Sequence, residues 1–366
     1  MRFQCDRARL ADLLALVAEA APARAPRPVC QNILIEAAPE GGALLFSATD
    51  MEMAIRHRLD PSQLKDPEKV LLPAQRFLSI VRDDRSEHMD VQITGHVAKI
   101  NTDHFQYTLV GQPPEDFPEI PEMPEDQRVE IAGDDVADAA AKTIFATARA
   151  GDTRYALNGV LLVLHSDYCE FVSSDTHRLS CVSKRIGNPD KAEADGIVLT
   201  KGLTALARMA AGRETVVLRL TGKMLMASTP DAFLSVRLVE GQFPRYKEVI
   251  PSKLEKRIAV NREEISWRLR NLSVMANDLA PVITFETVGD DILSISAEGE
   301  AGDGRTELDA VIRGGEVKVA YKCHFLMDLV KALQEDEQVA FQMRDGDTPT
   351  RVDSGDFVHV IMPTKP

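Results

Sequence analysis

The sequence is poor in aromatic residues, and only one of its 366 residues is a tryptophan. It also lacks long apolar runs. The segment Gly159–His165 (GVLLVLH) is among the longest and is far shorter than the roughly 18 residues that cross a bilayer. Charged residues occupy the start of the chain (MRFQCDRARLADLL), where a secretion signal needs an apolar stretch. We therefore expect neither export nor membrane insertion.

Cysteine is scarce as well. The five cysteines are odd in number and no two have C-x-x-C spacing, which disfavours a disulfide framework and a zinc ribbon. We expect free thiols in a cytoplasmic protein. The sequence also lacks the phosphate-binding P-loop, H-E-x-x-H, G-x-S-x-G and EF-hand motifs. We expect no catalytic residue, no metal site and no cofactor.

Basic residues are in the minority. Forty-three lysines and arginines stand against fifty-seven acidic residues, a net charge of −14. This balance argues against a protein whose whole surface binds nucleic acid. It leaves room for one basic face on an acidic molecule.

Repetition is the most informative feature present. The segment FPEIP that starts at Phe117 returns as FPRYKEVIP at Phe243, 126 residues later. SATDMEM (47–53) resembles SSDTHRL (173–179), and FQYTLV (105–110) resembles FLSVRLV (233–239) and FVHVIMP (357–363). In this alignment Phe105, Phe233 and Phe357 correspond. A period of about 125 residues is too long for a solenoid unit and fits a small domain.

Each third of the chain also shows two helical patterns. A strand followed by a helix opens each third, and a second strand–helix pattern follows at 70–82, 197–213 and 317–333. Segments rich in proline and glutamate mark the joins, most clearly at 112–127. The sequence predicts three similar α+β domains, 1–125, 126–251 and 252–366, each with two helices packed on antiparallel sheet.

The second helices differ from the first in charge. Residues 73–82 carry +2, residues 201–213 carry +3 and residues 318–332 carry +2, within a chain of −14. Cations at any one helix end or solvated face have an ordinary structural explanation. Their recurrence in three repeats favours a shared basic surface that binds the phosphate backbone without reading sequence. Aromatic residues are not interleaved with these cations, so stacking on single-stranded bases is not favoured.

Two clusters of polar residues resemble catalytic groups. Ser174, Asp175 and His177 are close in sequence, but a hydrolytic triad is defined by geometry and not by adjacency. The pair Asp134–Asp135 is most simply a helix N-terminus. A hydrolase or transferase built on Asp175 and His177, or on a metal, is an alternative hypothesis.

Four segments carry a family resemblance: RYALNG (154–159), SSDTHRLS (173–180), EGQFPRYKEVIP (240–251) and VIMPTKP (360–366). Their order and spacing resemble the bacterial DNA polymerase sliding clamps, the β subunits of DNA polymerase III, over the full length. The resemblance implies a protomer of three clamp domains that forms a ring as a head-to-tail dimer around double-stranded DNA. Such a ring is not an enzyme. It tethers the polymerase to DNA and so raises processivity, which is an effective-concentration effect.

The resemblance also implies partners and site residues. The partners are duplex DNA, bound without sequence specificity, the replicative polymerase, the clamp loader and other proteins with short motifs rich in Gln, Leu and Phe. The implied DNA-binding residues are Arg24, Arg76, Arg149, Lys201 and Lys322. The implied deep part of the peptide pocket comprises Leu157, Thr176, His177, Arg178, Leu179, Pro244, Val249, Val360 and Met362. Its approach comprises Arg154, Phe325, Pro349 and Pro363. At the dimer interface, Phe105 and Tyr107 are expected to meet Val274 and Met275.

The sequence departs from the family at three places. Glu248 stands where the family often has a basic residue, and Thr364 and Pro366 replace apolar residues at the C-terminus. These changes support a further alternative, a clamp-like paralogue that has lost DNA or polymerase binding.

Overall fold

The structure is a computed structural model that describes residues 1–148, 155–276, 281–300 and 302–365. Within these ranges no helix is long and apolar enough to cross a membrane. The chain forms two compact units. Unit 1 comprises Met1–Ala137 and Ile186–Leu238, and unit 2 comprises Asp138–Arg185 and Val239–Pro366. Each unit is described on its own.

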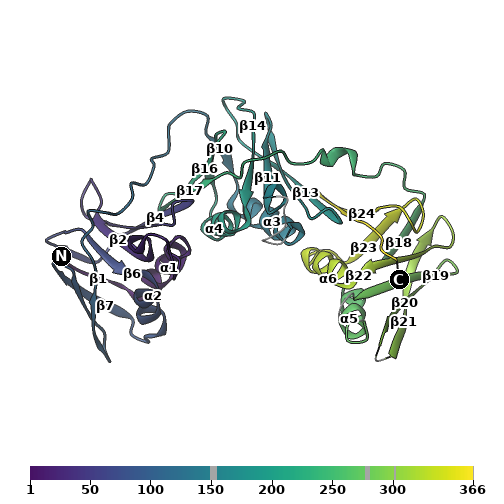
Figure 1. The fold of residues 1–366 in the computed structure, drawn as a ribbon, viewed down its shortest axis with the longest axis horizontal. Coiled ribbons are helices and arrows are strands. Elements are labelled where there is room, and N and C mark those ends of the chain that lie inside the picture. Colours follow the sequence, from purple (N-terminus) through teal and green to yellow (C-terminus); the bar gives the residue numbers. More distant parts are fainter. Residues whose placement is uncertain (149–154, 277–280, 301, 366) are drawn as a thin grey trace. The chain divides into compact units, whose positions relative to one another are not determined.

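The same order of elements occurs three times along the chain (Figure 1). The first set is β1 (Arg2–Asp6), α1 (Arg7–Val17), β2 (Asn32–Ala37), β3 (Leu44–Thr49), β4 (Met53–Leu59), β5 (Gln63–Lys65), β6 (Val70–Pro73), α2 (Ala74–Asp83), β7 (His88–Thr94), β8 (Val97–Asn101) and β9 (Gln106–Val110). The second set is β10 (Val129–Ile131), α3 (Gly133–Thr143), β11 (Gly159–Leu164), β12 (Tyr168–Ser174), β13 (Arg178–Arg185), β14 (Ala194–Leu199), α4 (Thr200–Ala210), β15 (Val216–Leu220), β16 (Met224–Ser228) and β17 (Ala232–Arg237). The third set is β18 (Lys256–Asn261), α5 (Arg262–Leu272), β19 (Val282–Val288), β20 (Ile292–Gly299), β21 (Gly302–Arg313), β22 (Lys318–Lys322), α6 (Cys323–Ala332), β23 (Gln338–Met343), β24 (Thr350–Ser354) and β25 (Phe357–Ile361). Apart from the short extra strand β5, the three sets match, which confirms the predicted α+β repeat. The domain boundaries stay a prediction.

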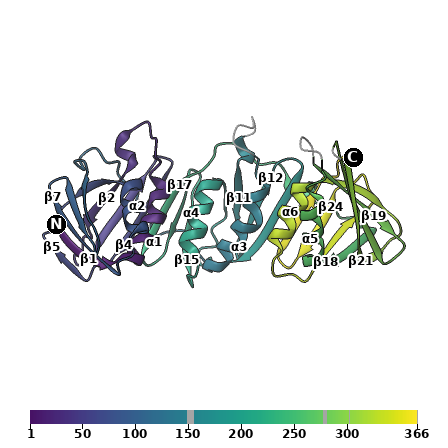
Figure 2. The same ribbon diagram turned by 90° about the horizontal axis from the view of Figure 1, so that it is seen from below.

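Unit 1 contains two antiparallel sheets. One has the strand order β5-β1-β7-β8-β9 and the other β10-β15-β16-β17-β4-β3-β2-β6. Helices α1 and α2 pack side by side, α1 against β3 and β4 and α2 against β2 and β6, as Figures 1 and 2 show. The helix α1 begins where the carboxylate of Asp6 accepts a hydrogen bond from the Arg9 backbone N–H (2.8 Å), an N-cap. Leu10 and Leu14 on its inner face are fully buried.

Unit 2 joins the strands of two repeats in one run, β11-β12-β13-β25-β24-β23-β18-β21-β20-β19-β22. The helices α5 and α6 pack against each other (Figure 1). The core beneath them is aromatic, with the Phe285 ring meeting Tyr321 and Phe341 edge to face at 5.5 and 5.4 Å between centroids.

Two junctions between repeats have the same register. In unit 1, β17 pairs with β4 from Ala232 opposite His57 to Val236 opposite Met53. In unit 2, β25 pairs with β13, and Phe357 lies opposite Val182. Adding 125 to both members of each β17–β4 pair gives the β25–β13 pair, so the repeat extends to the pairing of the strands.

The turn after Asp50 recurs 125 residues later, after Asp175. Asp50 and Asp175 each accept two backbone N–H bonds from the turn that follows, and the next residues, Met51 and Thr176, have φ of 77° and 76°. This left-handed conformation is rare for residues other than glycine. Its occurrence at both positions confirms the predicted match between SATDMEM and SSDTHRL.

One predicted alignment is wrong by a residue. The backbone N–H of Thr102 bonds the Phe105 carbonyl, and that of Thr229 bonds the Ala232 carbonyl. The structural counterpart of Phe105 is therefore Ala232 and not Phe233. The sequence match aligned the two phenylalanine side chains, whereas the hydrogen-bonded turn determines which residue comes first in the strand.

Candidate functional sites

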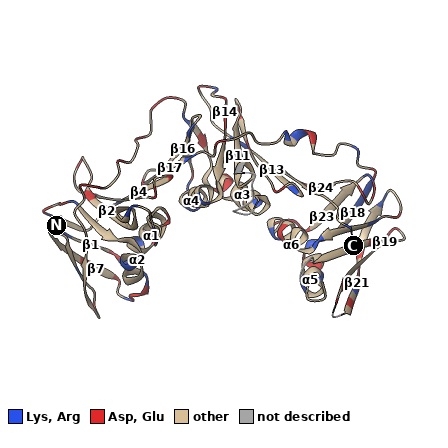
Figure 3. Cartoon of the chain, viewed as in Figure 1, with Lys and Arg blue, Asp and Glu red and all other residues tan. Residues whose placement is uncertain are grey.

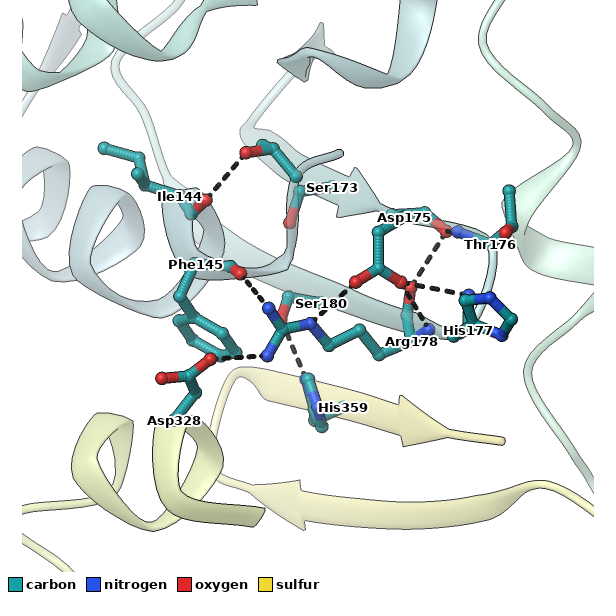
Figure 4. Close-up of polar contacts among 12 residues, drawn as sticks. Ile144, Phe145, Ser173, Asp175, Thr176, His177, Arg178, Ser180, Asp328 and His359 are labelled. Carbon is teal, nitrogen blue, oxygen red and sulfur yellow. Dashed lines mark hydrogen bonds and ion pairs between the residues drawn. The ribbon is translucent and has the colours of Figure 1, made fainter. Parts of the chain in front are cut away.

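Arg178 on β13 is the hub of a polar network in unit 2 (Figure 4). Its Nε donates to Asp175 Oδ2 (3.0 Å), its Nη1 donates to Asp328 Oδ2 on α6 (2.7 Å), and its Nη2 donates to the Phe145 carbonyl. The residue is only 7% exposed. A buried guanidinium is tolerated because its donors meet carboxylates and a carbonyl in this way.

Aromatic rings enclose the same guanidinium. Its central carbon lies 4.4 Å from the ring centroid of Phe325 and 5.3 Å from that of Phe145, within cation–π range. The ring of His177 lies 6.4 Å from that of Phe325. Arg178 thus links the turn that carries His177 to the predicted pocket residue Phe325 on α6.

His359 on β25 lies beneath this network. Its Nδ1 hydrogen-bonds Ser180 Oγ at 2.8 Å, whereas its buried Nε2 has no hydrogen-bond partner within the described residues. Burial, aided by the charge of Arg178, lowers the pKa of His359 to about 3. The imidazole is therefore neutral near neutral pH.

Four of the predicted pocket residues lie on β13, β25 and α6, namely Arg178, Leu179, Val360 and Phe325. Leu179 is opposite Val360 in the strand register, and the Met362 backbone N–H donates to the His177 carbonyl (2.8 Å). Leu179, Val360 and Phe325 are buried, whereas Met362 is 37% exposed. Thr176 and His177 are exposed, Pro349 and Pro363 are half-buried, and Leu157 is buried at the end of a short 3₁₀ turn. Arg154 lies outside the described residues.

The linker after β17 carries Pro244 and Val249, and it is anchored separately. Tyr246 Oη donates to the carboxylate of Glu170 on β12 (2.9 Å), and Lys247 Nζ lies 3.2 Å from the same carboxylate. Although burial acts to raise the pKa of Glu170, the hydrogen bonds from His165, Tyr246 and Lys247 lower it below its usual range. Val249 is left 47% exposed. Glu170 was not among the residues predicted from the sequence, because no neighbouring residue in the sequence signals this role.

Glu248, the predicted departure at the pocket edge, lies in the same linker. Its carboxylate is 3.4 Å from Arg245, and both side chains are largely exposed. An exposed pair of this kind contributes little to stability.

The predicted DNA-binding residues do not occupy equivalent positions. Lys322 is the N-cap of α6, Lys201 is the second residue of α4 and Arg76 is the third residue of α2. Lys201 is paired with Asp50 (3.0 Å) and Glu52 (2.6 Å). Arg24 and Arg76 are exposed, and Arg149 lies outside the described residues. All three repeats therefore have a basic residue at the start of the second helix, but its position in the helix differs from one repeat to the next.

The helix dipole does not explain these cations. The first turns of α2, α4 and α6 contain no acidic residue, and each helix also has a cation in its last turn. A helix N-terminus carries partial positive charge, so cations there are unfavourable unless an anion binds. The dipole explanation applies only to the last-turn cations Arg82, Arg208 and Lys331. Charged residues of both signs are spread over the helices and strands of each unit (Figure 3).

The residues expected at the dimer interface lie on two surfaces. Phe105 precedes β9 and is 55% exposed, with its ring 5.6 Å from that of Tyr107. Val274 follows α5 and is 80% exposed. Met275 lies beside the start of β21, since a Cβ added at Gly304 would be 3.2 Å from its Cγ.

The Ser174, Asp175 and His177 cluster forms a turn. Ser174 Oγ donates to the Arg178 carbonyl (2.9 Å), and the oxygens of Asp175 accept from backbone N–H groups and Arg178. The arrangement is not that of a hydrolytic triad. Within the described ranges no group of three or more His, Cys, Asp or Glu residues could hold a metal ion.

Comparison with known proteins identifies the family. Models of the N-terminal, central and C-terminal domains of the DNA polymerase III beta subunit match residues 1–121, 130–245 and 247–365. The chain belongs to this family. Its function is that of a DNA polymerase III sliding clamp.

Individual relatives agree over the whole length. The chain is 26% identical to the beta sliding clamp of Pseudomonas aeruginosa over 371 residues, covering 100% of both chains, and 25% identical to that of Chlamydia muridarum, covering 99% of that protein. The solved structure of the P. aeruginosa DNA polymerase III beta subunit matches with a TM-score of 0.89 at 26% identity and full coverage of both chains. A Thermotoga maritima beta subunit, at 22% identity and with 100% of this chain and 99% of its own covered, matches in fold with a TM-score of 0.91.

Proposed function

We propose that two copies of this sliding clamp join head to tail into a ring that encircles double-stranded DNA and holds the replicative polymerase on it. On this proposal the clamp catalyses no reaction and acts in the cytoplasm, in keeping with its five buried cysteines, none of which forms a disulfide bond. The observation that carries the proposal is the shared register of the two internal junctions. In the first junction β4, the third strand after α1, pairs with β17, the last strand of the second repeat. In the second junction β13, the third strand after α3, pairs with β25, the last strand of the third repeat.

One strand in each of these two positions remains for pairing with a second copy: β21, the third strand after α5, and β9, the last strand of the first repeat. Within the described residues, β9 pairs with β8 alone among the strands, and β21 over Gly302–Asp309 pairs only with β20. Leu59 of β4 pairs with Leu44 of β3, and Leu308 of β21 pairs with Leu293 of β20. These two pairs are equivalent, so Leu59 and Leu308 hold the same position on their strands. On this proposal the dimer junction repeats the internal register, which pairs Phe105 with Thr306 of the partner subunit.

In such a dimer the two predicted interface surfaces would meet. Tyr107 comes opposite the partner's Gly304, which lies beside the partner's Met275. Because the two surfaces belong to opposite ends of the chain, the contact is heterologous, and two copies can close a ring only if the rotations match.

The proposed DNA contacts are Arg24, Arg76, Arg149, Lys201 and Lys322. Cations at helix N-termini attract phosphate and read no sequence, as sliding requires. Lys201 must exchange Asp50 and Glu52 for phosphate, so its contribution is expected to be smaller than that of the exposed Arg76.

Charge reversal tests these contacts. We expect Arg76→Glu and Lys322→Glu to weaken DNA binding and to make the dependence of log K on log salt shallower by about one for each cation removed. Lys331→Glu is the matched control because Lys331 lies in the last turn of the same helix as Lys322. Equal loss in Lys322→Glu and Lys331→Glu, measured by fluorescence anisotropy on duplex DNA, would contradict the assignment.

We also propose that the residues around Arg178 bind the short Gln-, Leu- and Phe-containing motifs of the polymerase, the clamp loader and other partners. Val249 and Met362 expose apolar surface suited to a Leu or Phe anchor, and His177 offers polar atoms at the edge. A relative from P. aeruginosa, 25% identical and matching with a TM-score of 0.91 over 100% of both chains, has been solved bound to griselimycin, so a clamp of this fold holds a ligand.

Truncation of one exposed pocket side chain tests the peptide site. We expect Met362→Ala to weaken binding of a synthetic peptide containing Gln, Leu and Phe by about tenfold, because an anchor contact is lost. Val288→Ala, which truncates another exposed apolar residue, should leave the affinity unchanged. Undetectable binding by the unmodified protein would favour a paralogue that has lost partner binding.

A further inference from the structure

Trp267, the only tryptophan of the chain, is 57% exposed on α5. Asn271 and Val274 follow it at the spacing of one helix face, and Val274 is 80% exposed. An aromatic side chain of this size gains more than most from leaving water. The α5 face is continuous with the proposed dimer interface at Val274 and Met275.

The counterpart of Trp267 in unit 1 is Asp12. Helices α1 and α5 both begin after a capping side chain, Asp6 or Asn261, that accepts the backbone N–H three residues later. Asp12 and Trp267 are each the sixth residue of their helix. The side chains around Asp12 at the β4–β17 junction therefore show what surrounds the sixth residue of this helix at a junction within one chain.

Asp12 faces a cavity of about 390 Å³ at that junction. Other residues that line it are Arg208, Asp231 and Ala232. Arg208 Nη1 donates to Glu19 (2.8 Å) and to the Ala15 carbonyl (3.3 Å), so the end of α4 reaches α1. The lining combines two acids and four arginines with apolar side chains, among them Leu13, Leu16 and Met209.

At the proposed dimer junction several corresponding residues differ in kind, and Glu264 takes the place of Arg9 as the third residue of its helix. Arg82 corresponds to Arg208, since each is the ninth residue of its helix. The turn closed by Thr102 makes Phe105 the counterpart of Ala232 and His104 that of Asp231. Two acids are thus replaced by Trp267 and His104, and an alanine is replaced by a phenylalanine.

We propose that Trp267 inserts between the subunits, against Phe105 of the partner subunit and Arg82 of the partner subunit, and fills the space that stays open at the internal junction. The aromatic pair and the stacked guanidinium favour this packing. The partner is a second copy of this chain, and the inference rests on the head-to-tail dimer proposed above. Each ring contains two such contacts.

The single tryptophan makes the contact directly observable. Dilution of the unmodified protein through its dimer dissociation should shift Trp267 emission to longer wavelength and increase acrylamide quenching, while sedimentation reports the dimer fraction. Trp267→Ala should raise the dimer dissociation constant at least tenfold. In the dimer formed by Phe105→Ala at high concentration, emission should lie at longer wavelength than in the unmodified dimer.

Controls separate this contact from folding and from the dimer itself. Val288→Ala should leave the dissociation constant unchanged, and circular dichroism checks that each variant folds. A dimer whose Trp267 emission equals that of the monomer, with Trp267→Ala binding within twofold of the unmodified protein, would overturn the inference and leave the ring intact. Absence of a dimer at any concentration would instead overturn the proposed ring.

Discussion

Single residues decide the polar interior of unit 2. Arg178 is satisfied by Asp175, three residues before it, and by Asp328, 150 residues after it. The sequence motif predicted the first contact, because a turn is local. It could not predict Asp328 or the Glu170–Tyr246 bond, whose partners are 76 residues apart, since the strand register that brings them together is set by the whole sheet.

The buried imidazole of His359 predicts a pH dependence of stability. Its pKa is lowered to about 3 in the folded protein, whereas in the unfolded chain it takes up a proton near pH 6.5. As the pH falls from 6.5 toward 3, the unfolded state binds a proton that the folded state does not, so the free energy of unfolding falls. The contribution approaches about 1.4 kcal/mol per pH unit.

Urea titrations between pH 7 and pH 4 measure this effect. His359→Asn removes the titrating group and should make the free energy of unfolding less dependent on pH over this interval. His96→Asn, which replaces an exposed histidine, is the control and should keep the slope of the unmodified protein. Equal slopes in the unmodified protein and His359→Asn would show that His359 does not titrate as described.

At the scale of elements, periodicity predicted the helices well, and packing explains what it missed. The basic segments 73–82, 201–213 and 318–332 contain α2, α4 and α6. Their cations, however, occupy different positions of the first turn, because helix starts are set by the preceding strand and not by charge. Gly202, the third residue of α4, is another case, since glycine is less favourable in a helix than alanine.

Close packing explains Gly202. A Cβ added there would lie 2.6 and 2.9 Å from the two methyl groups of Val236 on β17. Gly202→Ala gains about 1 kcal/mol of helix propensity but should lose about 1–3 kcal/mol to overpacking, giving a net loss of stability in urea unfolding. Gly222→Ala, where the added Cβ meets nothing within 4 Å, is the control. A stabilised Gly202→Ala protein would mean that β17 and α4 can move apart at little cost.

At the scale of the whole molecule, the three repeats were readable from the sequence because each repeats its turns and strand patterns. The shared register of the internal junctions was not readable, since it is set by the pairing of strands from different repeats. The one-residue error at Phe233 arose because the sequence match aligned two phenylalanines, whereas the equally long turns align Phe105 with Ala232. Within the part of the chain that the structure describes, the unpaired edges of β9 and β21 became evident only once the pairing of β4 with β17 and of β13 with β25 was known.

The central claim is that the clamp holds DNA by enclosing it. The direct measurement is retention on a nicked circular duplex after loading by the cognate clamp loader, before and after the circle is cut once. The account predicts stable retention on the circle and rapid loss from the linear product, because a ring can slide off a free end. Equal retention on circular and linear DNA would contradict it and would mean that the protein binds DNA by surface contacts alone.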